Sequence, residues 1–265
     1  MKKLFFVIII LLTFSEAEAK EINRNGGSFI IGSSFTHAHK AEAVRASTPE
    51  KPRHKPQKTS NDDPIEPLNR IIFAVNSVVD RFIVKPAAQI YGYCVPLWGR
   101  DRVSNVIYNL SEPATSVNSA LQGDPKNAFA AFWRFAVNTI FGVLGTFDVA
   151  TSINLTDHQE DLGQTFAAWG WDNSNYFVLP LFGSSTIRDG LGFAVEIVTA
   201  DPVDNYVLTT KEQNIRLAVE AIDDRLDLLP LSERIDATSN DKYISYRDAY
   251  LQRRSDEIKN IEAVE

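Results

Sequence analysis

The chain has 265 residues, 44% of them hydrophobic, and a formal net charge of -7 at pH 7. Its single cysteine cannot form an intrachain disulfide, so the fold depends on a packed core alone. The excess of acidic residues argues against a nucleic-acid partner and against docking on anionic headgroups by charge, because both kinds of binding depend on lysine and arginine.

Residues 1–19 have the pattern of a secretory signal peptide. Two lysines precede an unbroken apolar run at 4–12, and small residues at 17–19 precede a cleavage site. The run is far shorter than the roughly 20 apolar residues of a membrane-spanning helix, so we expect cleavage that leaves Lys20 at the N-terminus. Cys94 is not placed for acylation, so the sequence predicts an exported protein that is not a lipoprotein.

Residues 20–62 show little apolar periodicity, and glycines and prolines are scattered among their polar residues. This composition predicts a disordered tether. Residues 63–265 are numerous enough for one domain with a substantial core. The sequence therefore predicts a signal peptide, a tether and a helical domain.

The domain opens with a predicted helix at 63–84. Asp63-Pro64 followed by Glu66 is typical of a helix start, with a side-chain cap, a proline in the first turn and an acid near the positive end of the dipole. Apolar residues then recur at steps of three and four, and they are Ile65, Leu68, Ile72, Val75, Val79 and Phe82. Lys85-Pro86 is expected to end this helix.

Two further helices are predicted at 100–121 and 125–141. The first pauses at about 109 and resumes past Pro113. Gly123 is expected to close it, and Asp124-Pro125 to open the next helix with a side-chain cap and a proline at the first position.

The predicted helix at 125–141 is apolar around most of its circumference and has one narrow polar seam. Asn127, Arg134 and Asn138 form the seam at the α-helical period. A charge at the bilayer centre costs at least about 2.5 kcal/mol, so a membrane-embedded or core helix that turns at the following glycines is favoured over a simple span. The side chains expected to face the membrane are Phe129, Phe132, Trp133, Phe135, Ile140 and Phe141.

The rest of the domain is less regular. Residues 161–192 alternate glycines with aromatic clusters, and short strands are conceivable around 176–179. A helix with one apolar face is predicted at 211–229. A more polar helix at 241–261 is expected to lie on the outside of the domain, as a peripheral C-terminal element.

The sequence predicts no catalytic residue, no metal site and no cofactor. Three of its four histidines fall in the tether, and its cysteine and histidines lack the close spacing of a zinc site. It contains no phosphate-binding loop or dinucleotide fingerprint. A lipid hydrolase that uses Ser152 or Ser185 with His158 is a remote alternative, because no nucleophile elbow accompanies these residues.

Polar side chains recur on single faces of the three predicted helices. They are Asn69 and Asn76 on the first, Asn105 and Asn109 on the second, and Asn127, Arg134 and Asn138 on the third. Two interpretations stay open. The amides could line a shared, wet passage for lipid headgroups, or they could be the caps and interhelical hydrogen bonds that buried amides usually form.

A series of motifs resembles the MlaA (VacJ) family over about 63–206. The motifs occur in order, and they include Asp63-Pro64-Ile65-Glu66-Pro67-Leu68-Asn69-Arg70, Asn109-Leu110-Ser111-Glu112-Pro113, Leu121-Gln122-Gly123-Asp124-Pro125, Glu160-Asp161-Leu162-Gly163-Gln164-Thr165 and Ser185-Thr186-Ile187-Arg188-Asp189-Gly190.

The resemblance implies an all-α fold, a ring-like arrangement of amphipathic helices that lies in the inner leaflet of the outer membrane, on its periplasmic side. It implies a non-enzymatic protein that removes mislocalised phospholipid from the outer leaflet and passes it through an amphipathic channel to a periplasmic carrier, often while bound to a trimeric porin. The alternative is a porin-bound structural adaptor of the cell envelope that moves no lipid. Well-known members are lipoproteins, and in this respect the chain departs from the family.

Overall fold

The computed structural model describes residues 63–197 and 208–262, so the predicted signal peptide and tether lie outside the described residues. The described part is helical apart from one antiparallel pair of short strands. Its elements are α4 (Glu66–Val79), the π-helical turn η2 (Asp80–Val84), α5 (Lys85–Cys94), α6 (Leu97–Gln122), α7 (Pro125–Ile140), α8 (Val149–Ser152), α9 (Leu162–Ala168), β1 (Tyr176–Leu179), β2 (Gly183–Thr186), α10 (Ile187–Val195), α12 (Thr210–Thr238) and α13 (Lys242–Glu262).

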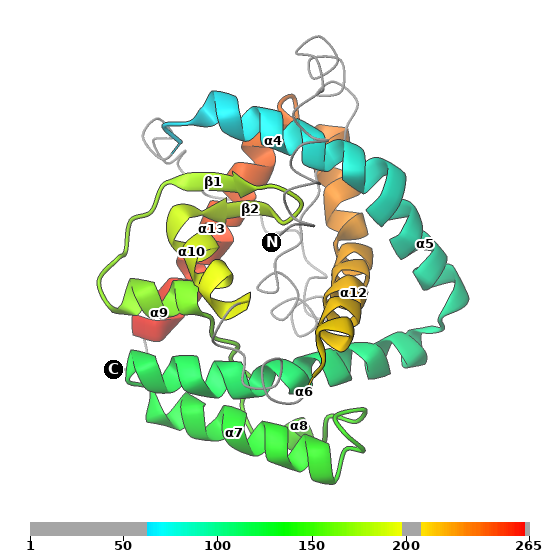
Figure 1. Cartoon of the computed structure of the whole chain (residues 1–265), viewed down its shortest axis with the longest axis vertical. Coiled ribbons are helices and arrows are strands. Elements are labelled where there is room, and N and C mark those ends of the chain that lie inside the picture. Colours follow the sequence, from blue (N-terminus) through cyan, green and yellow to red (C-terminus); the bar gives the residue numbers. More distant parts are fainter. Residues whose placement is uncertain (1–62, 198–207, 263–265) are drawn as a thin grey trace.

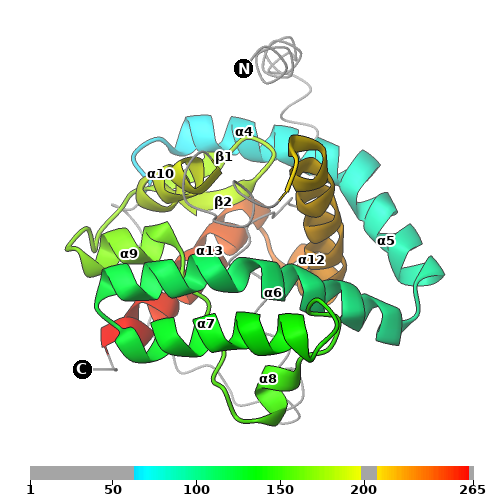
Figure 2. The same ribbon diagram turned by 60° about the horizontal axis from the view of Figure 1, so that its bottom comes forward.

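The helices follow one another around a ring (Figure 1). In that view α4 and α5 form the upper right of the ring, α6 forms its base with α7 beneath, and the sheet, α10 and α13 form its left side. Turning the molecule shows α6 and α7 lying side by side (Figure 2). The predicted all-α, ring-like arrangement is confirmed. Within residues 63–197 and 208–262, no helix has an apolar stretch of the length that crossing a bilayer requires.

The predicted end of the first helix at Lys85-Pro86 is wrong, because a π-helical turn carries the chain past the proline. The backbone N–H of Lys85 donates to the carbonyl oxygen of Asp80, one residue further back than in an α-helix. Pro86 then stands in the first turn of α5, where its missing N–H costs no hydrogen bond. The chain therefore bends into α5 without a loop.

The helical hairpin of α6 and α7 confirms the predicted cap signals. Gly123 ends α6 in the left-handed region, with φ at 85°. The Asp124 carboxylate accepts hydrogen bonds from the backbone N–H groups of Lys126 and Asn127, and Pro125 stands in the first turn of α7. Pro113 lies inside α6, which is continuous rather than interrupted.

Residues 161–192 are more regular than predicted. The strand expected at 176–179 is β1, which pairs with β2 so that Tyr176 faces Thr186 and Leu179 faces Gly183. Two helices were not predicted: α9, which begins with an Asp161–Gln164 capping box, and α10, which Thr186 caps. Both are shorter than ten residues and rich in glycine, so their sequences carry little helical periodicity.

The prediction of a peripheral C-terminal helix is wrong. Three tyrosines of α13, Tyr243, Tyr246 and Tyr250, are buried in the main hydrophobic cluster with Phe73 of α4 and Tyr176 of β1. The sequence of α13 is polar in composition because its buried side chains are tyrosines and arginines rather than aliphatic residues. Two of the tyrosine hydroxyl groups donate to carboxylates: that of Tyr243 to Asp63, and that of Tyr250 to Asp189 at 2.8 Å.

Candidate functional site

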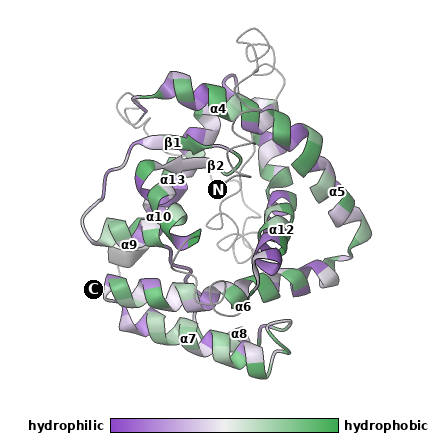
Figure 3. Ribbon diagram, in the orientation of Figure 1, coloured by the Kyte–Doolittle hydropathy of each residue, from purple (hydrophilic) through white to green (hydrophobic). Residues whose placement is uncertain are grey.

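Hydrophobic and hydrophilic residues alternate along α7 (Figure 3), and several of its large apolar side chains are exposed. Five of the six residues expected to face a membrane are exposed: Phe129, Phe132, Trp133, Ile140 and Phe141. The sixth, Phe135, is half-buried. The rings of Phe129 and Phe132 both pack edge-on against Trp133, with ring centroids 5.8 and 5.7 Å apart. Water therefore meets a continuous aromatic patch, which is unusual for a soluble monomer.

The loop after α7 extends this apolar face. Phe147 and the consecutive residues Val143 and Leu144 are exposed, and the φ angles of Val143 and Leu144 are 54° and 56°. Side chains rarely adopt such left-handed backbone, least of all a β-branched residue such as valine. Only glycine fits at position 142, because the Cβ of any other residue would lie 2.1 Å from the carbonyl oxygen of Phe147.

Below the apolar face, the polar seam of α7 is buried against α6 and α8. The Arg134 guanidinium binds Glu112 of α6 at 2.7 Å and lies 3.3 Å from Asp148. Asn138 donates to Asp148 at 3.2 Å and accepts from the backbone N–H of Ala150 at 2.8 Å. Burial acts to raise the pKa of Asp148, but hydrogen bonds from Thr151 and the charge of Arg134 outweigh it and lower that pKa.

Three other predicted amides join the same layer. Asn127 donates to the hydroxyl of Ser119 at 2.8 Å and to the carbonyl of His158 at 3.0 Å. Asn109 donates to the hydroxyl of Thr139, and Asn105 to the carbonyl of Thr146 in the loop after α7. These side chains tie α6, α7 and the loop together.

The remaining two amides lie elsewhere, where α4 meets the sheet. Asn69 donates to the carbonyl of Tyr176 and accepts from the backbone N–H of Val178 at 3.0 Å. Asn76 likewise bonds the carbonyl of Leu179 and the N–H of Leu181. The structure thus places the seven predicted lining residues in two separate groups, and their polar atoms bond other parts of the protein. A passage lined by them stays a prediction.

Sequence reasoning missed further exposed apolar side chains along α4, η2, α5 and the start of α6. They are Leu68, Ile71, Phe82, Ile83, Ile90, Tyr93, Leu97 and Trp98. The sequence places Leu68 and Phe82 in the apolar stripe of the first helix, yet Phe82 is 70% exposed. A periodic stripe indicates which residues share a face, not whether protein or lipid covers that face.

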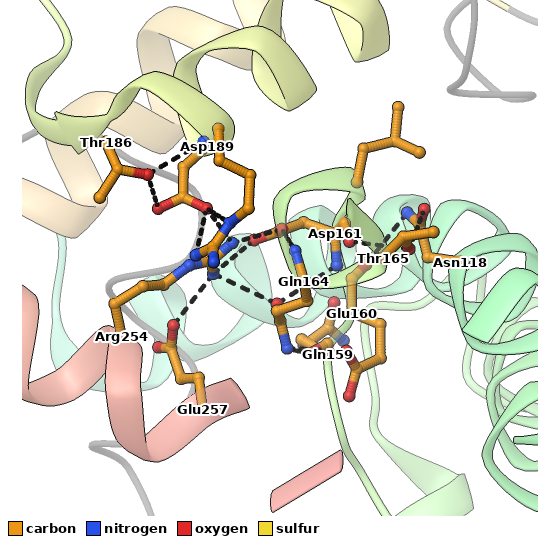
Figure 4. A network of polar contacts seen from close by, with 12 residues as sticks. Asn118, Gln159, Glu160, Asp161, Gln164, Thr165, Thr186, Asp189, Arg254 and Glu257 are labelled. Atoms are coloured by element: carbon orange, nitrogen blue, oxygen red, sulfur yellow. Dashed lines mark hydrogen bonds and ion pairs between the residues drawn. The ribbon is translucent and has the colours of Figure 1, made fainter. Parts of the chain in front are cut away.

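A third feature is a buried arginine that forms ion pairs with carboxylates from three helices (Figure 4). Arg254 of α13 donates to Asp161 at 2.6 Å, to Asp189 at 3.0 Å and to Glu257 at 3.1 Å. Burial acts to raise the pKa of Asp189, but Arg254 and Arg188 outweigh it and lower that pKa. Gly163 makes this approach possible, since a Cβ there would lie 2.4 Å from an oxygen of Asp189.

Two glutamates beside this cluster are held by neutral groups. Glu160 accepts from the amides of Gln122 and Gln164, and Glu196 accepts from Asn118 and from the backbone N–H of Leu162. Burial raises the pKa of each to about 7, and the charge of Asp161 adds to the effect.

The raised pKa values predict that the protein loses stability between about pH 4.5 and 7. A carboxyl with a raised folded-state pKa stabilises the fold at low pH, and that contribution is lost as pH rises from its ordinary value of 4.5 through about 7. Glu196→Gln should therefore flatten the profile by roughly 1–2 kcal/mol. Denaturant titrations across this window measure it, with the exposed Glu212→Gln as the control. The prediction would be contradicted if stability changed equally with pH in the parent protein, in Glu196→Gln and in Glu212→Gln.

The proposed hydrolase residues do not form a catalytic arrangement. Ser185 is buried in β2, where its hydroxyl donates to the carbonyl of Thr186. Ser152 and His158 are exposed, and the His158 ring makes no hydrogen bond within the described part of the chain.

Comparison with known proteins gives consistent relatives. The sequence pattern of a family described as MlaA lipoprotein matches residues 61–257. The chain is 31% identical to the intermembrane phospholipid transport system lipoprotein MlaA of Haemophilus influenzae over 79% of this chain and 84% of that protein. It is 36% identical to the protein of the same name from Escherichia coli over 72% and 76%, respectively.

A solved structure shares the fold. It is described as the structural basis for maintenance of bacterial outer membrane lipid asymmetry, and it matches with a TM-score of 0.64 and 35% identity over 74% of this chain and 98% of that one. The sequence, the helical ring and the exposed apolar faces agree, and the chain belongs to the MlaA family.

Proposed function

We propose that this protein removes mislocalised phospholipid from the outer leaflet of the outer membrane and passes it to a periplasmic carrier. The observation that carries the proposal is the exposed apolar face of α7 and its loop on a chain of the MlaA family. Relatives named as components of intermembrane phospholipid transport support it.

In this proposal the ring lies in the periplasmic leaflet of the outer membrane after export. Acyl chains cover Phe129, Phe132 and Ile140, whose exposure to water would cost about 25 cal/mol for each Å² of apolar surface. A trimeric porin and a periplasmic lipid carrier are the proposed partners. Headgroups move past the ring along an amphipathic channel, for which the seven predicted polar residues remain the proposed lining.

Lipid analysis tests this proposal. Detergent-extracted protein should copurify with phospholipid, as measured by mass spectrometry, and a deletion strain should expose more phospholipid to a phospholipase added outside the cells. Phe132→Ser combined with Ile140→Ser should lower the amount of bound phospholipid several-fold, because it places two hydroxyl groups on the apolar face. Lys259→Gln, on the exposed end of α13, serves as the matched control.

The alternative function is a porin-bound adaptor that moves no lipid. An adaptor would copurify with its porin but without phospholipid, and the deletion strain would keep a normal outer leaflet. That pair of results would replace the transport proposal with the adaptor.

A further inference from the structure

Residues 153–160 form a strap that connects α8 to α9 and lies against the α6–α7 hairpin. The outer side of the strap faces water, since Thr156, Asp157 and His158 are exposed. The side chains of the hairpin that bind its inner side are buried, and they are Thr115, Asn118, Asn127 and Arg134. The strap is therefore a thin cover over a polar face of the hairpin, on which two of the predicted lining residues lie.

The hydrogen bonds that hold the strap run from donors on the helices to oxygen atoms of the strap. Asn127 donates to the carbonyl oxygen of His158 at 3.0 Å. Arg134 donates to the carbonyl oxygen of Leu155, also at 3.0 Å. The side-chain oxygen of Gln159 accepts from two hydroxyl groups of α6, at 2.9 and 3.3 Å. The strap thus supplies acceptors to a set of donors on the hairpin.

Apolar packing contributes little to holding the strap. Ile153 is 56% exposed and Leu155 is half-buried, and neither belongs to the main hydrophobic cluster of the described residues. Asn154 has left-handed backbone, with φ at 62°, which asparagine tolerates better than most residues. When such a segment lifts, its hydrogen bonds to the protein are exchanged for hydrogen bonds to water, so the net loss is small. The middle of the strap is therefore weakly held.

Both ends of the strap are fixed more firmly than its middle. On one side the Asp148 carboxylate caps α8 by accepting from the backbone N–H of Thr151 at 3.1 Å. On the other side Arg254 binds Asp161, the first residue after the strap, at 2.6 Å (Figure 4). The strap can therefore lift while α8 and α9 stay in place.

The polar groups at the inner side of the strap match a zwitterionic phospholipid headgroup. Asn118, Asn127 and Arg134 carry donors that suit phosphate oxygens once the strap carbonyls leave. The carboxylates of Glu112 and Asp148, both of which bind Arg134, suit an ammonium group. The side-chain oxygen of Asn127 is buried and accepts no hydrogen bond within the described part of the chain, so it is a further acceptor for that group.

We propose that the strap lifts from the α6–α7 hairpin and admits the headgroup of a phosphatidylethanolamine-like lipid to the polar face beneath it. The inference rests on the proposed function for its ligand, and it adds that the polar face is closed until the strap moves. Strap carbonyls then take the place of phosphate oxygens while no lipid is bound. This accounts for Asn127 and Arg134 bonding other parts of the protein.

Labelling of a buried cysteine tests the movement of the strap. Full-length protein carries Thr115→Cys beneath the strap or Ser77→Cys in α4, at side chains that are each 2% exposed, and the exposed Cys94 is changed to serine. We expect a water-soluble maleimide to label the Thr115→Cys variant at least about tenfold faster, because local opening uncovers position 115 whereas position 77 requires unfolding.

Loosening the strap should speed this labelling. Asn127→Ala removes the bond to the His158 carbonyl, so it should raise the labelling rate of the Thr115→Cys variant about fivefold, the effect of one hydrogen bond on an equilibrium. Asn105→Ala is the matched control, since it removes a bond from α6 to the loop after α7 and should leave the rate unchanged.

Short-chain lipids test the ligand. Dihexanoyl phosphatidylethanolamine should slow the labelling of the Thr115→Cys variant several-fold, because its headgroup then covers the opened face. Dihexanoyl phosphatidylglycerol, which has no ammonium group, should protect less, and inorganic phosphate should not protect at all. The labelling of the Ser77→Cys variant should stay the same in all three.

Several outcomes would overturn the inference. Equal labelling of the two cysteine variants, or equal effects of Asn127→Ala and Asn105→Ala, would refute the movement of the strap. Equal protection by the two lipids, or protection by phosphate alone, would refute the ligand. A deletion strain with a normal outer leaflet, alongside fast labelling that phosphatidylethanolamine slows, would refute the transport proposal and leave this inference standing.

Discussion

Replacing Arg254 with methionine is expected to destabilise the protein by about 3–5 kcal/mol. The guanidinium is buried, and its loss removes the cation that binds Asp161 and Asp189 together, so that Asp189 keeps only its ion pair with the adjacent Arg188 among the ion pairs of the described residues. Methionine keeps most of the side-chain volume, so the effect isolates the charge. The free energy of unfolding in denaturant measures it.

Lys259→Met is the matched control, since it removes a base from the same helix where the side chain is 66% exposed. Exposed pairs contribute about 0–1 kcal/mol, so the control should stay close to the parent protein. If Arg254→Met lost no more stability than Lys259→Met, the carboxylate cluster would not be what holds α13 against α9 and α10.

Asp80→Ala is expected to cost a similar amount, about 3–5 kcal/mol, because it leaves Arg225 buried with Ser232 as its one side-chain hydrogen-bond partner among residues 63–197 and 208–262. The same change releases the π-helical turn from α12. We therefore expect faster amide hydrogen exchange over residues 80–85 in addition to the lower unfolding free energy.

Replacing both partners separates charge burial from shape. Burial raises the pKa of Asp80 although Arg225 binds it, which indicates that the ionised pair is costly to bury. Asp80→Leu with Arg225→Met should accordingly recover most of the stability that Asp80→Ala loses. A double variant as unstable as the single one would show that the hydrogen bonds, rather than the unpaired charge, hold the turn.

Local signals predicted much of the fold. The turn between α6 and α7 was predictable from Gly123, Asp124 and Pro125, because helix capping depends on neighbouring residues alone. The continuation of α4 into α5 and the place of α13 were not predictable in this way. Pro86 was absorbed by a π turn that Arg225 stabilises from far along the chain, and the burial of α13 depends on tyrosines whose partners, Asp63 and Asp189, come from other elements.

The site was predictable to a similar extent. The apolar face of α7 followed from its composition, since a helix apolar on most sides has more surface than one core can cover. The helical period predicts which amides share a face, but Asn69 and Asn76 bond a sheet whose position that period does not indicate. The exposed apolar side chains of α4, η2 and α5 were missed because the helical period does not indicate whether protein covers a face.

The closing contacts of the ring join its first and last helices. Arg70 binds Asp241, and Tyr243 donates a hydrogen bond to Asp63, across about the whole length of the described chain. Contacts this distant in sequence form slowly, since a long loop must be closed before they form. In newly made chains the faces of α4 and β1 should therefore stay uncovered until α13 packs against them, and that docking step is what protects the protein from aggregation.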